Sequence, residues 1–125
     1  MPIDAKQPYD STNIFARILR GEVPAKTIME SEHSLAFHDI NPLSPIHVLV
    51  IPKGAYVNWD DFSAKASDAE IADFTRTIGK VAAHVGADAQ GYRLLSNVGK
   101  RGGQEVPHLH VHLFGGAPLG PMLAR

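Results

Sequence analysis

The chain has 125 residues, with 12 Lys and Arg against 13 Asp and Glu, seven His and no Cys, and 44% of its residues are hydrophobic. This length fits one domain with a sizeable core, and the absence of Cys excludes disulfides, thiolate metal ligands and a cysteine nucleophile. A net charge of -1 argues against a nucleic-acid partner, and no apolar run reaches the ~20 residues of a membrane span, so we expect a cytoplasmic protein.

Residues 1–12 are mostly polar and carry two prolines, which predicts a flexible N-terminal arm ahead of a single domain over residues 13–125. Asn13 and the hydroxyl side chains before it can cap a short helix over residues 14–19, which Gly21 ends. Three strand-like segments follow, at residues 27–30, 34–40 and 46–51. Their short connections favour antiparallel pairing.

The second half of the chain contains the most regular pattern. Residues 55–66 are expected to form a polar loop, and then Ser67 and Glu70 form a capping-box pattern. Apolar residues recur at helical spacing as far as Val85, which predicts a long amphipathic helix packed on a sheet. Two further strands are expected at residues 91–97 and 106–114, separated by a glycine-rich loop at 99–103 and followed by a tail rich in Gly and Pro.

The segment His108–Phe114 alternates histidine with aliphatic residues three times. Successive side chains of a strand face opposite sides, so Leu109, Val111 and Leu113 are expected in the core while three imidazoles share the other face. Neighbouring histidines on that face would lie roughly 7 Å apart. This row of imidazoles is the strongest candidate for a functional site.

Three interpretations of the histidine face are open. It is an exposed polar surface, a metal site in which two adjacent imidazoles reach one zinc ion at about 2.0–2.1 Å, or the site of a histidine nucleophile. A neutral imidazole attacks phosphorus well when one nitrogen donates its proton to a fixed acceptor and the other keeps a free lone pair. His110, which has a histidine on either side, suits that last role.

The residues just before the histidine segment favour a phosphate ligand. The glycines of Gly99–Gly103 allow positive φ, which can turn backbone N–H groups inward to bind an anion, and Lys100 and Arg101 add positive charge. Asn97 and Gln104 flank this loop as amide donors. The loop matches neither of the common glycine-rich phosphate motifs, so it supports a phosphate ligand only through its position beside the histidines.

The chain resembles the histidine triad (HIT) family, in particular its histidine triad nucleotide-binding branch. The family motif is His-Φ-His-Φ-His-Φ-Φ, where Φ is apolar, and residues 108–114 match it throughout. The other segments that carry the resemblance are residues 14–26, 35–40, 102–104 and 118–123, the last of which is typical of bacterial members.

This resemblance implies an α+β homodimer in which each subunit has a five-stranded antiparallel sheet with one short and one long helix, and the two sheets join across the dimer. It implies hydrolysis of purine nucleoside phosphoramidates, of the adenosine 5′-phosphoramidate type, through a covalent nucleotidyl-histidine intermediate. The expected ligand is a purine nucleotide or nucleoside phosphoramidate, with no cofactor and no metal. Two other functions stay open: a nucleotide-binding or scaffold protein with vestigial catalysis, and a dinucleoside polyphosphate hydrolase.

The resemblance also implies roles for individual residues. His110 takes the place of the nucleophile, His112 contacts the phosphate oxygens and His108 orients the central ring. Asp39 accepts hydrogen bonds from the ribose hydroxyls, although a turn role is its alternative. The other positions expected at the nucleotide are Ile40 beside the ribose, Ile14, Phe15 and Phe37 around the base (with core packing as the alternative), and Asn97, Gly103, Gln104 and Glu105 around the phosphate.

The remaining predictions concern three histidines outside the motif and two positions that depart from the family pattern. His33, His47 and His84 are expected to be structural. Ala55 stands where some relatives have a fourth histidine, so no role passes to it. Glu105 stands where animal members have a serine at the scissile region, and a carboxylate there would either repel phosphate or assist the leaving amine.

Overall fold

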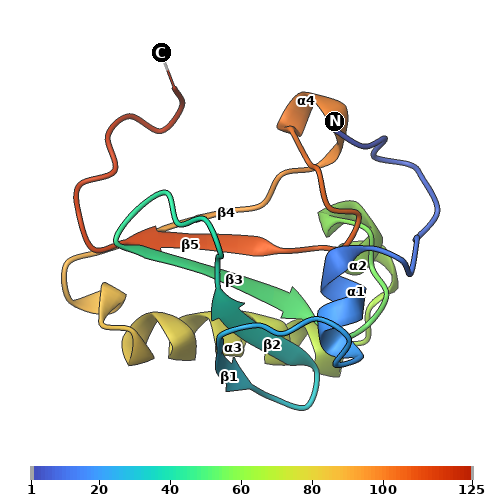
Figure 1. Cartoon of the computed structure of the whole chain (residues 1–125), viewed down its shortest axis with the longest axis horizontal. Helices are drawn as coiled ribbons and strands as arrows, with labels where there is room; N and C mark the ends of the chain where they lie inside the picture. Colours follow the sequence, from blue (N-terminus) through green and yellow to red (C-terminus); the bar gives the residue numbers. More distant parts are fainter. Residues whose placement is uncertain (1, 125) are drawn as a thin grey trace.

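The computed structural model describes residues 2–124 and contains one five-stranded antiparallel sheet in the order β1-β2-β3-β5-β4. Its strands are β1 (Thr27–Glu30), β2 (Ser34–His38), β3 (Ile46–Pro52), β4 (Arg93–Leu95) and β5 (Val111–Gly115). Figure 1 shows β3 and β5 side by side in the middle of the sheet, with both ends of the chain on the same side of the molecule. The predicted α+β class with five antiparallel strands is confirmed.

The helices of the described chain are α1 (Ile14–Leu19), α2 (Trp59–Lys65), α3 (Asp68–His84) and α4 (Gly99–Gly102), with a 3-10 turn at Ala87–Ala89. The two predicted helices begin at the predicted caps. The side chain of Asn13 accepts a hydrogen bond from the Ala16 N–H at the start of α1, and Ser67 and Glu70 form both halves of a capping box at the start of α3. Each cap satisfies backbone N–H groups that a helix leaves unpaired at its N-terminus.

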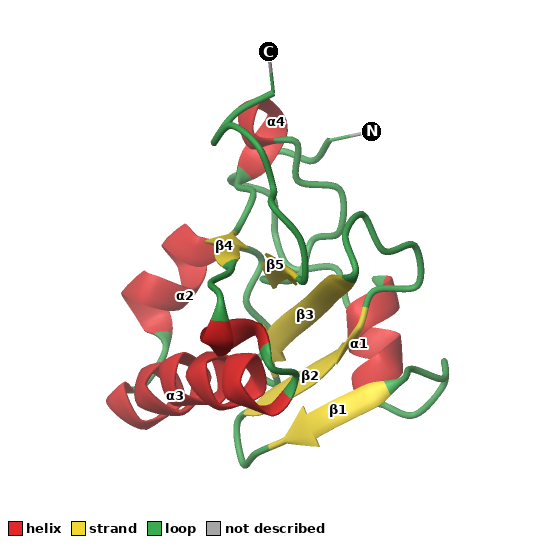
Figure 2. Ribbon diagram, turned by 90° about the vertical axis from the view of Figure 1, so that its left-hand side faces the viewer, coloured by secondary structure: helices red, strands yellow, loops and turns green. Residues whose placement is uncertain are grey.

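The two faces of the sheet pack against different helices, and Figure 2 shows α3 and α1 on opposite sides. The cluster on the α3 face contains Val48, Val50, Val111 and Leu113 from the central strands together with residues of α3. The smaller cluster on the α1 face joins Phe15 to alternate residues of the neighbouring strands, namely Leu35, Phe37, Leu49 and Ile51. Because side chains alternate along β5, the triad histidines belong to the α1 face.

The prediction of a polar loop at residues 55–66 is wrong, because helix α2 lies within this segment. The Asn58 side chain accepts a hydrogen bond from the Asp61 N–H at 3.1 Å and caps the helix. Phe62 is 2% exposed and anchors one side of α2 in the core, and Lys65 pairs with Asp61 at 2.9 Å one turn away. With only one buried anchor, α2 lacks the apolar repeat by which a longer helix is recognised.

The glycine-rich segment and the last strand also differ from expectation. Residues 99–102 form a single helical turn, α4, instead of an open loop. The last strand begins at Val111, five residues later than predicted, so His108 and His110 precede it. Pro107 has no N–H to contribute to a ladder, and the N–H of Leu109 donates to the Tyr56 carbonyl at 2.8 Å instead of to β3.

Residues 2–12 contain no helix or strand, but they lie against the domain at several points. The Ile3 N–H donates to the Gln104 carbonyl at 2.8 Å, and the Asn58 side chain donates to the Ala5 carbonyl at 2.8 Å. The flexibility of this arm and its boundary at residue 13 remain predictions. Within residues 2–124, no helix has both the length and the apolar character needed to cross a membrane.

Candidate active site

The ring of His110 is held at one nitrogen and open at the other. Its Nδ1 lies 2.7 Å from the carbonyl oxygen of His108, and because a carbonyl only accepts, Nδ1 carries the hydrogen. Its Nε2 makes no hydrogen bond within residues 2–124, and no buried side-chain nitrogen in that range lacks a partner. Nε2 therefore reaches solvent, although the residue as a whole is only 7% exposed.

Burial also sets the charge of this ring. Desolvation lowers the pKa of His110, and the opposing effects of the His108 carbonyl and the Asp39 carboxylate do not offset it. The ring is therefore neutral at pH 7, with its lone pair on the exposed Nε2. This is the arrangement that the sequence predicted for a nucleophile.

His108 is fully buried, with both ring nitrogens bonded to protein groups. Its Nε2 lies 2.8 Å from the Pro52 carbonyl, which only accepts, so Nε2 carries the hydrogen and Nδ1 is an acceptor. The hydroxyl of Tyr9, 2.6 Å away, donates to that Nδ1. Burial lowers the pKa of His108 to about 4. His108 thus contacts the central ring through its carbonyl oxygen, and its own ring has no free nitrogen for a substrate.

A chain of hydrogen bonds fixes the hydrogen of His112 as well. The Leu43 N–H donates to Nδ1 of His47 at 3.1 Å, so the neutral ring of His47 carries its hydrogen on Nε2. That Nε2 lies 3.0 Å from Nδ1 of His112 and donates to it. Burial, with smaller effects from His110 and His47, lowers the pKa of His112 to about 4. Neutral His112 therefore carries a hydrogen on Nε2, which suits donation to a phosphate oxygen.

His47 was expected to be structural, and the structure instead places it in the site. It is 3% exposed within an otherwise apolar strand. The signal that sequence reasoning lacked is the register of β3 against β5, which sets His47 opposite Phe114 and Leu49 opposite His112. A histidine two residues from the one opposite His112 lies on the same face of the sheet, within reach of its ring.

Asp39 lies at the same end of the site and has two partners. One carboxylate oxygen accepts the Asn41 N–H at 2.8 Å, as in a turn, and the other lies 3.5 Å from Nε2 of His47. The ligand atoms of Asp39, His47 and His112 all lie within 4.8 Å of one another, a spacing that suits a metal ion. However, Nε2 of His47 carries a hydrogen here, so a cation would bind only if the Leu43 hydrogen bond were lost.

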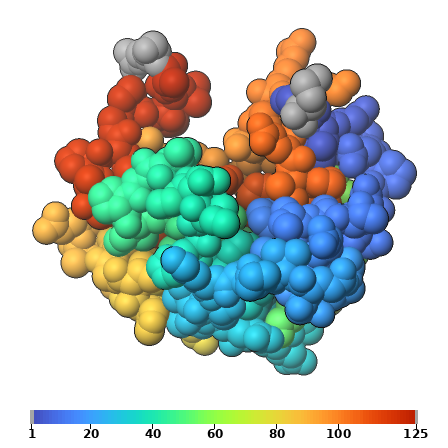
Figure 3. Space-filling view, viewed as in Figure 1, coloured from blue at the N-terminus to red at the C-terminus, as the bar shows by residue number. Residues whose placement is uncertain are grey.

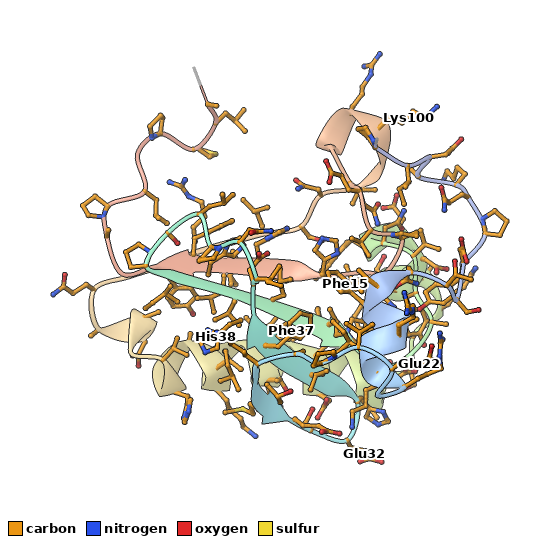
Figure 4. The ribbon with its side chains drawn as sticks, in the orientation of Figure 1. Phe15, Glu22, Glu32, Phe37, His38 and Lys100 are labelled. Carbon is orange, nitrogen blue, oxygen red and sulfur yellow. The ribbon has the colours of Figure 1, made fainter. Side chains whose placement is uncertain are left out.

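The residues expected around a base are divided between the core and the surface. Phe15 and Phe37 are buried with their rings 5.6 Å apart, and Figure 4 shows both side chains between α1 and β2. Both rings belong to the core, and the Phe15 ring also meets the His110 ring edge-on at 4.9 Å. Their contact with a base stays a prediction. Ile14 is 39% exposed and Ile40 is 91% exposed. Their contact with a base remains a prediction.

Among the residues expected at the phosphate, Gln104 is buried and hydrogen-bonded only to other protein groups. It is 1% exposed, and its amide donates to the carbonyls of Val57 at 2.7 Å and Val106 at 3.1 Å. Its carbonyl oxygen accepts the Gly99 N–H at 3.1 Å. Both amide hydrogens are used within the protein, so this side chain has none left for the expected phosphate contact.

The other three residues that were expected at the phosphate are accessible. Gly103 is exposed with φ of 78°, a left-handed conformation that favours glycine, and Glu105 is exposed after it. The side-chain amide of half-buried Asn97 makes no hydrogen bond within residues 2–124, which leaves it free for a ligand. Figure 4 shows Lys100 pointing from α4 away from the sheet.

Ser96 is a further residue that sequence reasoning did not single out. Its hydroxyl donates to the carbonyl oxygen of His110 at 2.9 Å. His110 is thus held at two places, at its ring by the His108 carbonyl and at its main chain by Ser96. Figure 3 shows the surface hollowed between the C-terminal tail and the region of α4 and the N-terminal arm, and Figure 1 places β5 below that hollow.

Comparison with known proteins gives consistent matches over most of the chain. The family model described as HIT domain matches residues 20–119. An uncharacterized 13.2 kDa HIT-like protein of Azospirillum brasilense is 62% identical over 117 residues, which cover 94% of this chain and 96% of that protein. The purine nucleoside phosphoramidase of Escherichia coli strain K12 is 41% identical over 112 residues, covering 90% and 93% of the two chains.

Solved structures give the same result for the fold. A HIT family hydrolase from Clostridium thermocellum superposes with a TM-score of 0.80 at 36% sequence identity. The match covers 92% of this chain and 99% of that one. The fold of this chain is therefore one that solved HIT structures share.

Proposed function

This chain belongs to the HIT domain family, and from that membership we propose that it is a purine nucleoside phosphoramidate hydrolase with His110 as its nucleophile. The observation that carries the proposal is the state of the His110 ring, whose Nδ1–H is held by the His108 carbonyl and whose Nε2 is free and open to solvent. The similarity to the E. coli purine nucleoside phosphoramidase supports the substrate class.

The proposed reaction has two displacements at phosphorus. Nε2 of His110 attacks the α-phosphorus, and the P–N bond breaks as its nitrogen takes up a proton and leaves as the amine. Water then attacks the phosphorus of the nucleotidyl-histidine, the P–Nε2 bond breaks, and a proton passes to solvent, which restores the neutral ring. Because the site imidazoles have lowered pKa values, we assign the amine's proton to water and not to a resting imidazolium.

The neighbouring groups would stabilise the charge that develops on the phosphoryl oxygens. Nε2–H of His112 donates to one of them, and the free amide of Asn97 is available for another. The Nδ1–H of His110 strengthens its bond to the His108 carbonyl as the ring becomes positive. These donors are already oriented before substrate binds, so they cost little reorganisation during the reaction.

Intact-mass spectrometry after rapid quenching with adenosine 5′-phosphoramidate tests the proposal. We expect a fraction of the protein to gain the mass of one adenosine monophosphate, and we expect no gain in His110→Ala. Turnover without an adduct would contradict the covalent mechanism, and binding without turnover would favour a nucleotide-binding or scaffold protein. Faster cleavage of a diadenosine polyphosphate in a parallel assay would favour a dinucleoside polyphosphate hydrolase.

We further propose that two copies pair through the outer edge of β4. This strand ends the sheet, and Leu94 on it is 44% exposed. Pairing two such edges would satisfy their free backbone groups and join the sheets, as the family resemblance implies. Sedimentation velocity should give a dimer that Leu94→Lys weakens, and a monomer at micromolar concentration would contradict this pairing.

A further inference from the structure

We propose that Tyr9, in the N-terminal arm, is a positioning residue for the nucleophile and acts on it through His108. The inference rests on the proposed function and extends the site to a residue 99 positions away from its partner in the chain. Neither the histidine motif nor the expected nucleotide contacts include this tyrosine.

The direction of the Tyr9–His108 hydrogen bond follows from the other end of the ring. The Pro52 carbonyl can only accept, so it takes the hydrogen on Nε2 of His108 and leaves Nδ1 with a lone pair. The Tyr9 hydroxyl at 2.6 Å must then be the donor. Burial raises the pKa of Tyr9, which keeps this hydroxyl protonated over the range in which enzymes are assayed. The imidazole is thus fixed at both nitrogens.

Fixing the ring of His108 also fixes its carbonyl oxygen, the acceptor for Nδ1–H of His110 at 2.7 Å. Phe15 adds apolar contact, because its ring meets the rings of His108 at 6.4 Å and His110 at 4.9 Å. The Tyr9 hydroxyl, the His108 ring, the His108 carbonyl and the His110 ring therefore form one connected series. Movement at its first member changes where the free Nε2 of the nucleophile lies.

The N-terminal arm contacts both ends of the glycine-rich segment at residues 99–103. The main chain of Ile3 bonds to residue 104, and Ala5 packs so closely on Gly99 that a side-chain carbon at that glycine would lie 2.7 Å from the Ala5 methyl. Between the arm and α2 there is a cavity of about 440 Å³ in which Tyr9 forms part of the wall. On that side the tyrosine is held by its hydroxyl and not by dense packing.

Without the hydroxyl, Nδ1 of His108 would be an acceptor with no donor in a fully buried position. The ring can then relax by turning or by moving its hydrogen from Nε2 to Nδ1, and either change breaks the bond to Pro52. Both changes loosen residue 108 and with it the carbonyl that orients His110. Because small misplacements of a reacting atom reduce the rate strongly, the effect should fall on kcat and not on nucleotide binding.

The experiment compares Tyr9→Phe and Tyr9→Ala with Tyr56→Phe. The control removes a hydroxyl that is hydrogen-bonded to the Glu70 carboxylate, at 2.8 and 2.9 Å, and not to a histidine of the triad. Each variant is assayed for kcat and KM on adenosine 5′-phosphoramidate. The nucleotide-free proteins are also compared by ¹⁵N NMR of the imidazole nitrogens, which reports tautomer and hydrogen bonding without turnover.

For Tyr9→Phe we expect kcat to fall about tenfold with KM within about twofold, and an equal fall for Tyr9→Ala if the hydroxyl and not the ring matters. The His108 Nδ1 signal should shift, and the His110 signals should change with it. Equal losses in Tyr9→Phe and Tyr56→Phe, or unchanged His108 and His110 signals, would overturn the proposal. A wild-type protein with no turnover would refute the hydrolase function, and the NMR comparison would then decide the role of Tyr9 by itself.

Discussion

The two faces of the central sheet are built from the same strands but differ in what their side chains contact. On the α3 face, Val111 and Leu113 join an apolar cluster that helix α3 covers. On the α1 face, the alternate residues His110 and His112 lie beside a smaller apolar cluster. Each keeps one ring nitrogen that has no hydrogen-bond partner among residues 2–124. The one-residue alternation of β5 therefore separates a stabilising face from a reactive one, so each can be tested by substitutions that leave the other intact.

The largest expected effect breaks the reactive face alone. His110→Ala removes the proposed nucleophile, and we expect turnover of adenosine 5′-phosphoramidate to fall by about a thousandfold or more, since covalent catalysis has no substitute there. Urea unfolding shows how much of any loss comes from stability, because the buried ring also packs edge-on against Phe15. His84→Ala, at the exposed end of α3, is the matched control. Near-normal turnover in His110→Ala would refute the mechanism.

The complementary change breaks the stabilising face alone. Leu113 stands between His112 and Phe114 in sequence, but it is fully buried and its side chain lies in the α3 cluster. Leu113→Ala should lower the free energy of unfolding by about 2–5 kcal/mol, the usual cost of a buried leucine truncated to a cavity. At a temperature where the variant is folded, kcat should stay within about twofold of wild type because no site contact is lost. A large loss of kcat without a loss of stability would show that the faces are coupled.

Acid should destabilise the folded protein through the buried ring of His108. His108 is neutral in the folded protein with a pKa of about 4, whereas an unfolded histidine titrates near pH 6.5. Between these values the unfolded state binds more protons, so stability is full above about pH 6.5 and falls as the pH drops toward 4. His108 alone should remove about 3 kcal/mol by pH 4. Urea unfolding at several pH values measures this, and a flat stability from pH 6.5 to 4 would contradict the buried neutral state.

The sequence predicted the stabilising face better than the reactive one, for a physical reason. Periodicity reports burial, so α3 with its capping box and the inward residues Leu109, Val111 and Leu113 were found correctly. The triad itself was found because its alternation is unusual. His47 and Tyr9 were missed, since their contacts depend on strand register and on the path of the arm, which no local pattern contains. Helix α2 was missed because a single buried phenylalanine gives no period.

A smaller effect is expected from the hydrogen-bond chain behind the triad. His47→Leu keeps the bulk of the side chain but removes the donor to Nδ1 of His112, so His112 can place its hydrogen on the wrong nitrogen. We expect kcat to fall about tenfold with little change in KM, because the contact is made to the transition-state charge. His47→Gln, which keeps a side-chain donor, should recover part of the rate. An unchanged ¹⁵N signal of His112 in His47→Leu would contradict this chain of hydrogen bonds.

The smallest expected effect concerns the cluster of Asp39, His47 and His112, whose spacing suits a metal ion. The Leu43 N–H requires a lone pair on Nδ1 of His47 and so places a hydrogen on Nε2, the atom that a cation would need. Treatment with EDTA should therefore leave kcat unchanged, whereas added zinc ion should inhibit only at concentrations high enough to displace that hydrogen. Loss of activity on chelation, restored by zinc, would show instead that the reactive face works through a bound metal. With activity retained, the polar groups of this face serve to hold hydrogens at chosen nitrogens, which the apolar α3 face has no means to do.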